Sequence, residues 1–422
     1  MRTFIIILCI VAVAIVGVAV YLVVTTPTEA RLLRFPLTTA QQELLRHVPA
    51  DAEAYALVPA PVVLLGKLKA NPITSEAATR WTEEHALPPA AMLGRADAVA
   101  WKSGKATEYA VRFDPVRAVI ARAWTLFSPI EATWSGRTLI VAQPPSGAAG
   151  FSPPNELQLS TTLPEGDLFV VQRGESRGAF PPIGRPAVTS VRVTEKNIEM
   201  TSHAATNDGG GRKPAATNDV GGPGTNDISG LKPAAPLRLE LPVGAMLAVS
   251  FNDPPRVLGD LERLIASDVD ALVGDGGVIA LYGVDARTLL PRPYGAIVVP
   301  ANDASRAAAA KYGNVLGEVR ESGGQLIIGL DRQSPEHYLK DAQVPVPWPA
   351  NRWALRIDPA RLIPVLRQVG DNPALRFAAP RVHRGARDLR RWMGVLEQAS
   401  SIEAAASVTG GVEKLRVRVA SK

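Results

Sequence analysis

An arginine-rich segment near the C-terminus is the group of residues whose type and spacing best suggest a chemistry. Its arginines are offset only by Asp388, and the candidate site consists of Arg381, Arg384, Arg387, Arg390 and Arg391. In a helix, residues 381, 384, 388 and 391 would share one face. Such a face can bind anionic lipid, an acidic polymer or an acidic protein partner. The alternative is a charged helix face that is only solvated. We expect Trp392 and Met393, which follow, to turn inward to the core.

The other residues that could do chemistry are scattered. The five histidines are isolated, with no second His, Cys or carboxylate at the spacing of a metal site. The glycine-rich piece 274–277 lacks the lysine of a phosphate-binding loop, and residues 321–324 are more simply a hairpin turn than a nucleophile elbow. We therefore predict no catalytic residue, no metal and no cofactor, and we regard an enzyme as the less favoured class.

Three aspartates recur at the junction of an apolar run and a helix-like segment. Asp114, Asp253 and Asp358 each follow a short apolar run, and each precedes a proline. An aspartate can accept hydrogen bonds from the free N–H groups of a helix start, and proline fits the first helical turn. The pattern predicts three helix caps, not an acidic cluster.

Composition and charge limit the class of protein. The 422 residues are 46% hydrophobic, which indicates a globular chain of more than one usual domain. The net charge of +6 is spread along the chain and gives no argument for nucleic acid. Cys9 is the single cysteine, so the body of the chain has neither disulfides nor thiolate metal sites. A cysteine-free body suits an oxidising compartment.

The N-terminus predicts a membrane anchor. Residues 3–24 are apolar and carry no charge, which is enough sequence for a helix that crosses a bilayer. We expect an uncleaved transmembrane segment over 1–24 and a stalk over 25–47. Arg2 lies before the run, and Arg31 and Arg34 follow it, so the charges alone leave the orientation open. The missing cysteines favour a single-pass protein of the inner (cytoplasmic) membrane with its body periplasmic or extracytoplasmic.

The body of the chain repeats itself. Residues 49–68 align without gaps on 242–261 with six identities. Later segments recur in the same order: 98–101 with 278–281, 109–113 with 295–299, 136–141 with 323–328, 168–171 with 353–356, and 190–200 with 407–419. Residues 202–236 are rich in Gly, Asn and Pro, which is typical of a flexible linker or loop. The predicted modules are therefore 48–201 and 237–422, the second with extra helices.

The repeat and the period-2 alternation at 190–193 and 414–419 predict the fold class. We expect an α+β protein: an N-terminal transmembrane helix, then two tandem-duplicated modules of mostly antiparallel sheet with helices on one face. We also expect Leu65 and Leu258 to be buried on equivalent helices. The anchor, the segment Val-Pro-Ala-Asp-Ala-Glu-Ala-Tyr-Ala-Leu-Val at 48–58, and the duplicated strand–cap–helix units resemble a family of uncharacterised bacterial envelope proteins. No catalytic residues are defined for that family.

These observations favour a binding function over catalysis. We expect a membrane-anchored protein of the cell envelope that binds a partner protein or a lipid-like ligand, because a duplicated sheet-and-helix module can form a groove. One alternative is a structural or assembly subunit of an envelope complex without a ligand. The other is a hydrolase with a dispersed active site.

Overall fold

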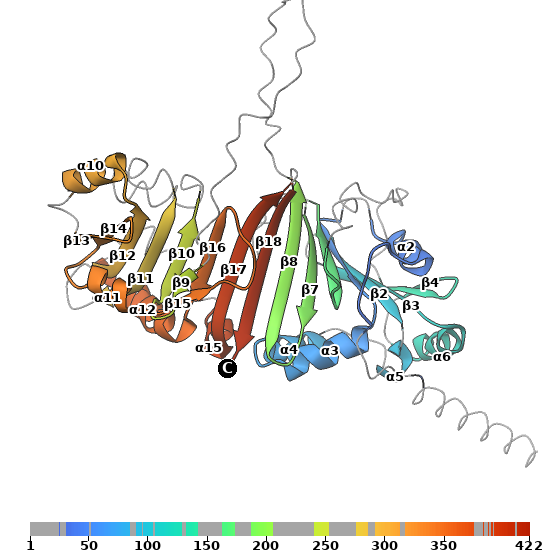
Figure 1. Ribbon diagram of the computed structural model, residues 1–422. Helices are drawn as coiled ribbons and strands as arrows, with labels where there is room; N and C mark the ends of the chain where they lie inside the picture. The colour runs from blue at the N-terminus through green and yellow to red at the C-terminus, as the bar shows by residue number, and fades with distance from the viewer. Residues whose placement is uncertain are drawn as a thin grey trace, which may run out of the picture. The chain divides into compact units, whose positions relative to one another are not determined.

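The computed structural model describes Thr25, 31–49, 52–84, 90–94, 96–103, 106–128, 132–141, 163–173, 187–205, 240–252, 276–285, 292–312, 317–374, His383, Arg387, Arg390, 392–409 and 412–422. The chain divides into two compact units, unit 1 over residues 1–205 and unit 2 over 206–422. Each unit has its own antiparallel strands, helices and buried clusters (Figure 1).

Unit 1 contains eight strands in the spatial order β8-β7-β6-β1-β2-β3-β5-β4, with antiparallel neighbours throughout. In the part of the chain that is described, they are β1 (Ala54–Val58), β2 (Asp97–Ser103), β3 (Ala106–Arg112), β4 (Thr133–Ser135), β5 (Thr138–Val141), β6 (Leu168–Gln172), β7 (Ala187–Val193) and β8 (Asn197–Ala205). Because side chains alternate along a strand, each strand presents a different set of residues to each face.

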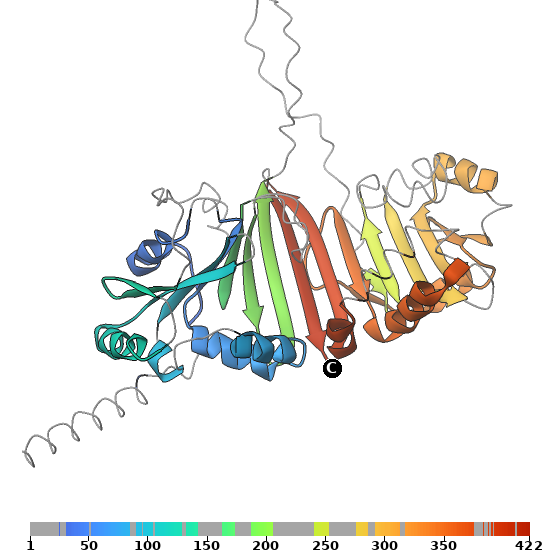
Figure 2. The same ribbon diagram turned by 180° about the vertical axis from the view of Figure 1, so that it is seen from behind.

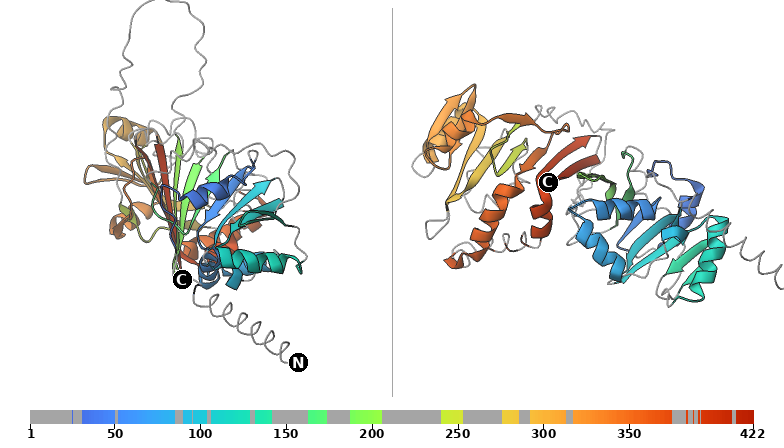
Figure 3. Two further views of the ribbon diagram at one scale, coloured as in Figure 1. Left: turned by 90° about the vertical axis from the view of Figure 1, so that its right-hand side faces the viewer. Right: turned by 90° about the horizontal axis from the view of Figure 1, so that it is seen from below.

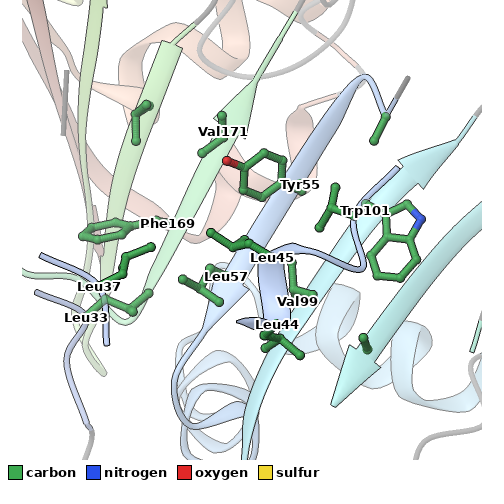
Figure 4. Packing of buried hydrophobic residues seen from close by; sticks show 14 residues of the cluster. Leu33, Leu37, Leu44, Leu45, Tyr55, Leu57, Val99, Trp101, Phe169 and Val171 are labelled. Carbon is green, nitrogen blue, oxygen red and sulfur yellow. The ribbon is translucent and has the colours of Figure 1, made fainter. Parts of the chain in front are cut away.

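The helices of unit 1 cover both of these faces. They are α2 (Thr39–Leu45), α3 (Pro61–Ala70), α4 (Ser75–Glu84), α5 (Ala90–Leu93) and α6 (Pro115–Thr125). On one face, Leu44 and Leu45 of α2 pack in a cluster with Leu57, Val99 and Trp101 (Figure 4). On the other face, Leu93 of α5 and Ala118 and Ala121 of α6 pack in a separate cluster with Val111.

Unit 2 repeats the strand order of unit 1. Its sheet runs β18-β17-β16-β10-β11-β12-β14-β13, so each strand has a counterpart at the same place in unit 1. The strands are β10 (Leu247–Phe251), β11 (Gly277–Asp285), β12 (Arg292–Pro300), β13 (Val319–Ser322), β14 (Gln325–Gly329), β16 (Trp353–Ile357), β17 (Ala399–Thr409) and β18 (Val412–Ser421). A separate antiparallel pair is formed by β9 (Glu240–Pro242) and β15 (Gln343–Pro345).

The helices of unit 2 also lie on both faces of their sheet. They are α10 (Asp303–Tyr312), α11 (Ser334–Lys340), α12 (Pro359–Asp371) and α15 (Met393–Gln398). Ala308 of α10 packs with Ile297 and Ile328, whereas Tyr338 of α11 packs with Ala280 and Val298, which point the opposite way. Leu366 of α12 and Leu396 of α15 belong to one buried cluster, and Figure 2 shows these two helices from behind.

The fold class predicted from the sequence is not the one that the structure shows. It began with a transmembrane helix, but none of the helices within the described residues is long and apolar enough to cross a membrane, and the predicted anchor at 1–24 lies outside those residues. It also placed the helices on one face, whereas both faces are covered. The reason is that strands such as β12 carry consecutive apolar residues, as strands buried on both sides do, and the alternating strands near the two C-terminal hairpins are the exception.

The predicted caps and turns can be compared with the structure at several points. Asp114 and Asp358 cap α6 and α12 as predicted: the Asp114 carboxylate accepts a hydrogen bond from the backbone N–H of Arg117 at 2.9 Å, and Asp358 caps in the same way. Asp253 lies outside the described residues. The predicted turn at 321–324 is confirmed, since Gly323 and Gly324 join β13 to β14 with φ of 57° and 73°.

The segment predicted as a linker begins inside a strand. Residues 202–205 belong to β8, where Ser202 pairs with Thr189 of β7. The remainder, 206–236, lies outside the described residues. Strand β8 therefore extends into the first residues of the segment that its composition had indicated to be a linker.

Candidate functional site

Two of the five candidate arginines are described, and they differ in their surroundings. Arg387 is exposed, whereas Arg381, Arg384 and Arg391 lie outside the described residues. The Arg390 guanidinium donates a hydrogen bond to the backbone carbonyl of Arg367 at 2.7 Å and pairs with the Asp371 carboxylate at 2.7 Å. The hydrogen bond to Asp371 raises the pKa of Arg390. Both partners belong to the last turns of α12, where the helix dipole favours a cation.

Trp392 and Met393, which follow these arginines, differ in their burial. Met393 packs against the cluster of α12 and α15, which confirms its inward orientation. The same prediction is wrong for Trp392, whose side chain is 43% exposed. The structure thus binds Arg390 to the end of α12 and leaves Trp392 at the surface.

A cavity in unit 1 is a second candidate, which the sequence did not predict. It has a volume of about 460 Å³ and lies between the strands β1, β2 and β3 and the helices α3, α4 and α5. Figure 3 (right) shows α3 and α4 side by side, in blue. Apolar residues form almost all of its wall: Val58, Pro61, Leu64, Leu65, Leu68, Ala77, Ala78, Trp81, Leu93, Ala98, Val99, Ala100 and Val111, with Thr74 and Tyr109.

Short side chains on the sheet explain why the cavity exists. Ala98 and Ala100 of β2 form its floor, while their neighbours Val99 and Trp101 fill the packed cluster on the opposite face (Figure 4). The methyl groups of these alanines extend only a short distance from the sheet, and the leucine side chains of α3 do not reach down to them. A space therefore remains between the helices and the floor.

One of the two floor positions carries a larger residue in unit 2. In unit 1, Ala56 of β1 pairs with Ala100, and in unit 2 the equivalent strands pair Val249 with Ile279. Ile279 therefore occupies the position of Ala100, and it packs in the cluster with Phe251 and Ile297. The same sheet position is filled in one unit and left short in the other.

Buried polar contacts fix the helices that cover the cavity. The Lys67 ammonium of α3 pairs with Asp167 at 2.6 Å, and the other carboxylate oxygen of Asp167 accepts a hydrogen bond from the backbone N–H of Val193 at 2.8 Å. Asn71, which is fully buried, donates to the backbone carbonyl of Thr194 at 2.8 Å. These contacts attach the C-terminal end of α3 to the ends of β6 and β7.

Leu65 shows how the cavity altered a sequence-based expectation. Leu65 and Leu258 were each predicted to be buried on the first helix of their own module, and Leu258 lies outside the described residues. Leu65 is only half-buried, because it lines the cavity instead of packing against the sheet. A sequence signal for the cavity does exist: alanines alternate at 54 and 56 and again at 98 and 100, on two strands that pair with each other.

The wall of the cavity offers contact but no acid–base chemistry. Its lining residues include no carboxylate, histidine, lysine or cysteine. Burial raises the pKa of the Tyr109 hydroxyl to about 12, so this group stays protonated at neutral pH. Within the described residues, no group of three or more His, Cys, Asp or Glu side chains could hold a metal ion. The arrangement suits the binding of a hydrocarbon.

The described residues form an antiparallel α+β protein with an apolar cavity in unit 1. No protein-family model matches the chain, and neither the curated proteins nor the solved structures show a significant similarity to it. The functional argument therefore rests on the geometry of the pocket.

Proposed function

We propose that this protein is a non-enzymatic binding protein that takes a lipid-like ligand into the pocket of unit 1. The observation that carries the proposal is the apolar cavity of about 460 Å³ beneath α3 and α4. This volume lies within the roughly 300–1,000 Å³ of small-molecule sites, which are mostly apolar with few polar groups. A lipid-like ligand was one of the two ligand classes favoured by the sequence.

The apolar wall of the cavity favours the hydrocarbon part of a ligand. Hydrocarbon fits, because a polar group buried there would meet only the hydroxyls of Thr74 and Tyr109. Each buried methylene contributes about 0.8 kcal/mol, or a factor of about four in affinity. A polar head group would remain outside, beyond Trp81, which is 37% exposed and therefore reaches the surface.

An affinity series tests the proposal. The full chain is titrated with saturated fatty acids of increasing length, and binding is followed by calorimetry and by tryptophan fluorescence, to which Trp81 contributes as one of seven tryptophans. We expect the affinity to rise about fourfold per methylene and then to level off when the cavity is full. Absence of binding for the whole series would contradict the proposal.

A filled-pocket variant provides the matched control. Ala100→Ile introduces the residue that unit 2 carries at the equivalent position, and it should abolish binding without lowering the melting temperature. Ala307→Ile adds the same atoms to an exposed position of α10 and should bind as the unaltered chain does. Equal affinity for both variants would show that the ligand binds elsewhere.

The proposal includes a location in the cell envelope, supported by the cysteine-free sequence after Cys9. A protein partner or anionic lipid at the exposed Arg387 remains part of the same proposal. A purely structural subunit would show no binding in the affinity series, so the same experiment separates the two classes.

A further inference from the structure

Helix α6 of unit 1 is apolar on two sides. Ala118 and Ala121 are buried against the sheet, as expected for a surface helix. The opposite side exposes Val119 to 68%, and Leu126 and Phe127, in the turn that ends the helix, to 81% and 88%. A surface helix normally carries polar residues on the side away from its core. Exposed large apolar residues that lie together usually mark an interaction site.

The repeat shows that the fold does not require the two exposed valines of α6, Val116 and Val119. Helix α10 of unit 2 has the same place as α6, because α6 connects β3 to β4 and α10 connects β12 to β13, which hold the equivalent places in the two strand orders. Counted from the caps at Asp114 and Asn302, Val116 corresponds to Ala304 and Val119 to Ala307. Both alanines are exposed, so the fold does not require a large apolar residue at either position.

The end of the apolar N-terminal sequence lies at this helix. Arg117, in the first turn of α6, is buried and donates a hydrogen bond to the hydroxyl of Thr25 at 2.7 Å. The charge-free sequence 3–24 ends one residue before Thr25. The charge-free N-terminal sequence therefore ends at the helix that carries the most exposed large apolar side chains among the described residues of unit 1.

We propose that Val116, Val119, Leu126 and Phe127, the α6 face, lie in the head-group layer of a lipid bilayer. A helix at this depth combines Phe, Leu or Trp with arginine, as this one does. Exposed Arg122 of α6 donates a hydrogen bond to the Gly136 carbonyl at 2.6 Å, and its guanidinium lies 5.2 Å from the centre of the Trp134 ring. This places a cation and an aromatic ring beside the apolar side chains, where lipid phosphates would be.

A bilayer fits this face better than a second copy of the chain. A stable protein interface buries roughly 800 Å² on each partner, more than four side chains on one 11-residue helix expose. A bilayer needs no matching surface and accepts single side chains. This inference concerns a different surface from the pocket and does not depend on the pocket having a ligand.

Site-specific fluorescence tests the inference. Cys9 is the only cysteine, so the full chain with Cys9→Ser accepts one label at a chosen position. Val119→Cys and Phe127→Cys report the α6 face. Thr39→Cys is the control, since Thr39 is exposed on α2, which covers the opposite face of the sheet of unit 1. Each protein, carrying an environment-sensitive dye, is mixed with phosphatidylcholine–phosphatidylglycerol vesicles with and without a quencher attached to the lipid.

We expect a blue shift and several-fold stronger quenching at 119 and 127 than at 39. Equal quenching at the three positions would overturn the inference, since attachment through the N-terminal sequence alone predicts that result. A blue shift that needs no lipid and grows with protein concentration would overturn it in favour of a second copy.

A charge variant at position 119 adds a second test, which is read out by the dye at position 127. Val119→Glu should remove the quenching at 127 and leave the melting temperature unchanged, because position 119 makes little contact with the fold. Ala307→Glu places the same charge at the equivalent position of α10 and should have no effect. Retained quenching in the Val119→Glu protein would also overturn the inference.

Discussion

At the scale of single residues, two aspartates in the same role should differ in their energetic weight. Asp358→Ala removes a helix cap and should cost about 1 kcal/mol of unfolding free energy. Asp114→Ala removes a cap and also the carboxylate that pairs at 2.7 Å with Arg117, which is buried, so the cost should approach 3 kcal/mol. Urea denaturation measures both values. Asp114→Asn, which can still cap, should lie between them, and equal costs for the two alanine variants would contradict this account.

Asp97 should give the stability of unit 1 a characteristic dependence on pH. Burial raises the pKa of this carboxyl above its ordinary value of 3.8, although Arg31, 3.7 Å away, acts against the shift. Asp97 therefore has a higher pKa in the folded state than in the unfolded state. At a pH between these two values the folded state holds more protons, so the free energy of unfolding falls as the pH rises through this window. Asp97→Asn should remove that part of the slope in denaturation curves measured from pH 3 to pH 8.

Glu43 provides the control of opposite sign. The hydrogen bond from Arg112 lowers the pKa of Glu43, so its contribution is present above the ordinary value of 4.5 and is lost as the pH falls. Glu43→Gln should flatten the acid side of the curve, and Asp97→Asn should not. A change of the same sign in the two variants would contradict the assignment.

At the scale of elements, the attachment of α3 should control access to the pocket. Asn71→Ala loses a donated hydrogen bond to Thr194 and an accepted one from the backbone N–H of Ile73, and it should cost about 1–3 kcal/mol. We expect faster hydrogen exchange in α3 and α4 and weaker ligand binding. Asn351→Ala in unit 2 also loses two hydrogen bonds, to and from Val408, and should leave exchange in α3 unchanged. Equal effects on α3 would show that Asn71 has no special role there.

The sequence predicted most elements of the fold but not their exact alignment. Its aspartate caps and glycine turns could be read directly, because each depends on a few neighbouring residues. The proposed match of 98–101 with 278–281 is displaced by one residue. The strand registers make Ala100 of unit 1 equivalent to Ile279 of unit 2, not to Ala280. A one-residue displacement exchanges the two faces of a strand. The pocket could not be predicted, because it depends on which face the alanines share with α3.

At the scale of the molecule, a matched pair of core substitutions should assign the ligand to one unit. Leu139 and Leu326 hold equivalent places on β5 and β14, facing Val111 and Val299, and both are buried. Truncation to alanine should cost about 2–5 kcal/mol in either case. Only Leu139→Ala should weaken ligand binding, measured below the melting temperature of each variant. Loss of binding in Leu326→Ala would mean that the pocket of unit 1 is not the site.

The strand order of both units bears on how the chain is made. β1 lies in the middle of its sheet between β2 and β6, and β10 lies likewise between β11 and β16. On the ribosome, β1 can pair with β2 as soon as both have emerged, but its other edge has no partner until residue 168 has been synthesised. The same delay recurs from β10 to residue 353. For these intervals an apolar strand edge stays open, and such edges recruit other chains. We therefore expect the nascent chain to be exposed to pairing with other chains twice, once during the synthesis of each unit.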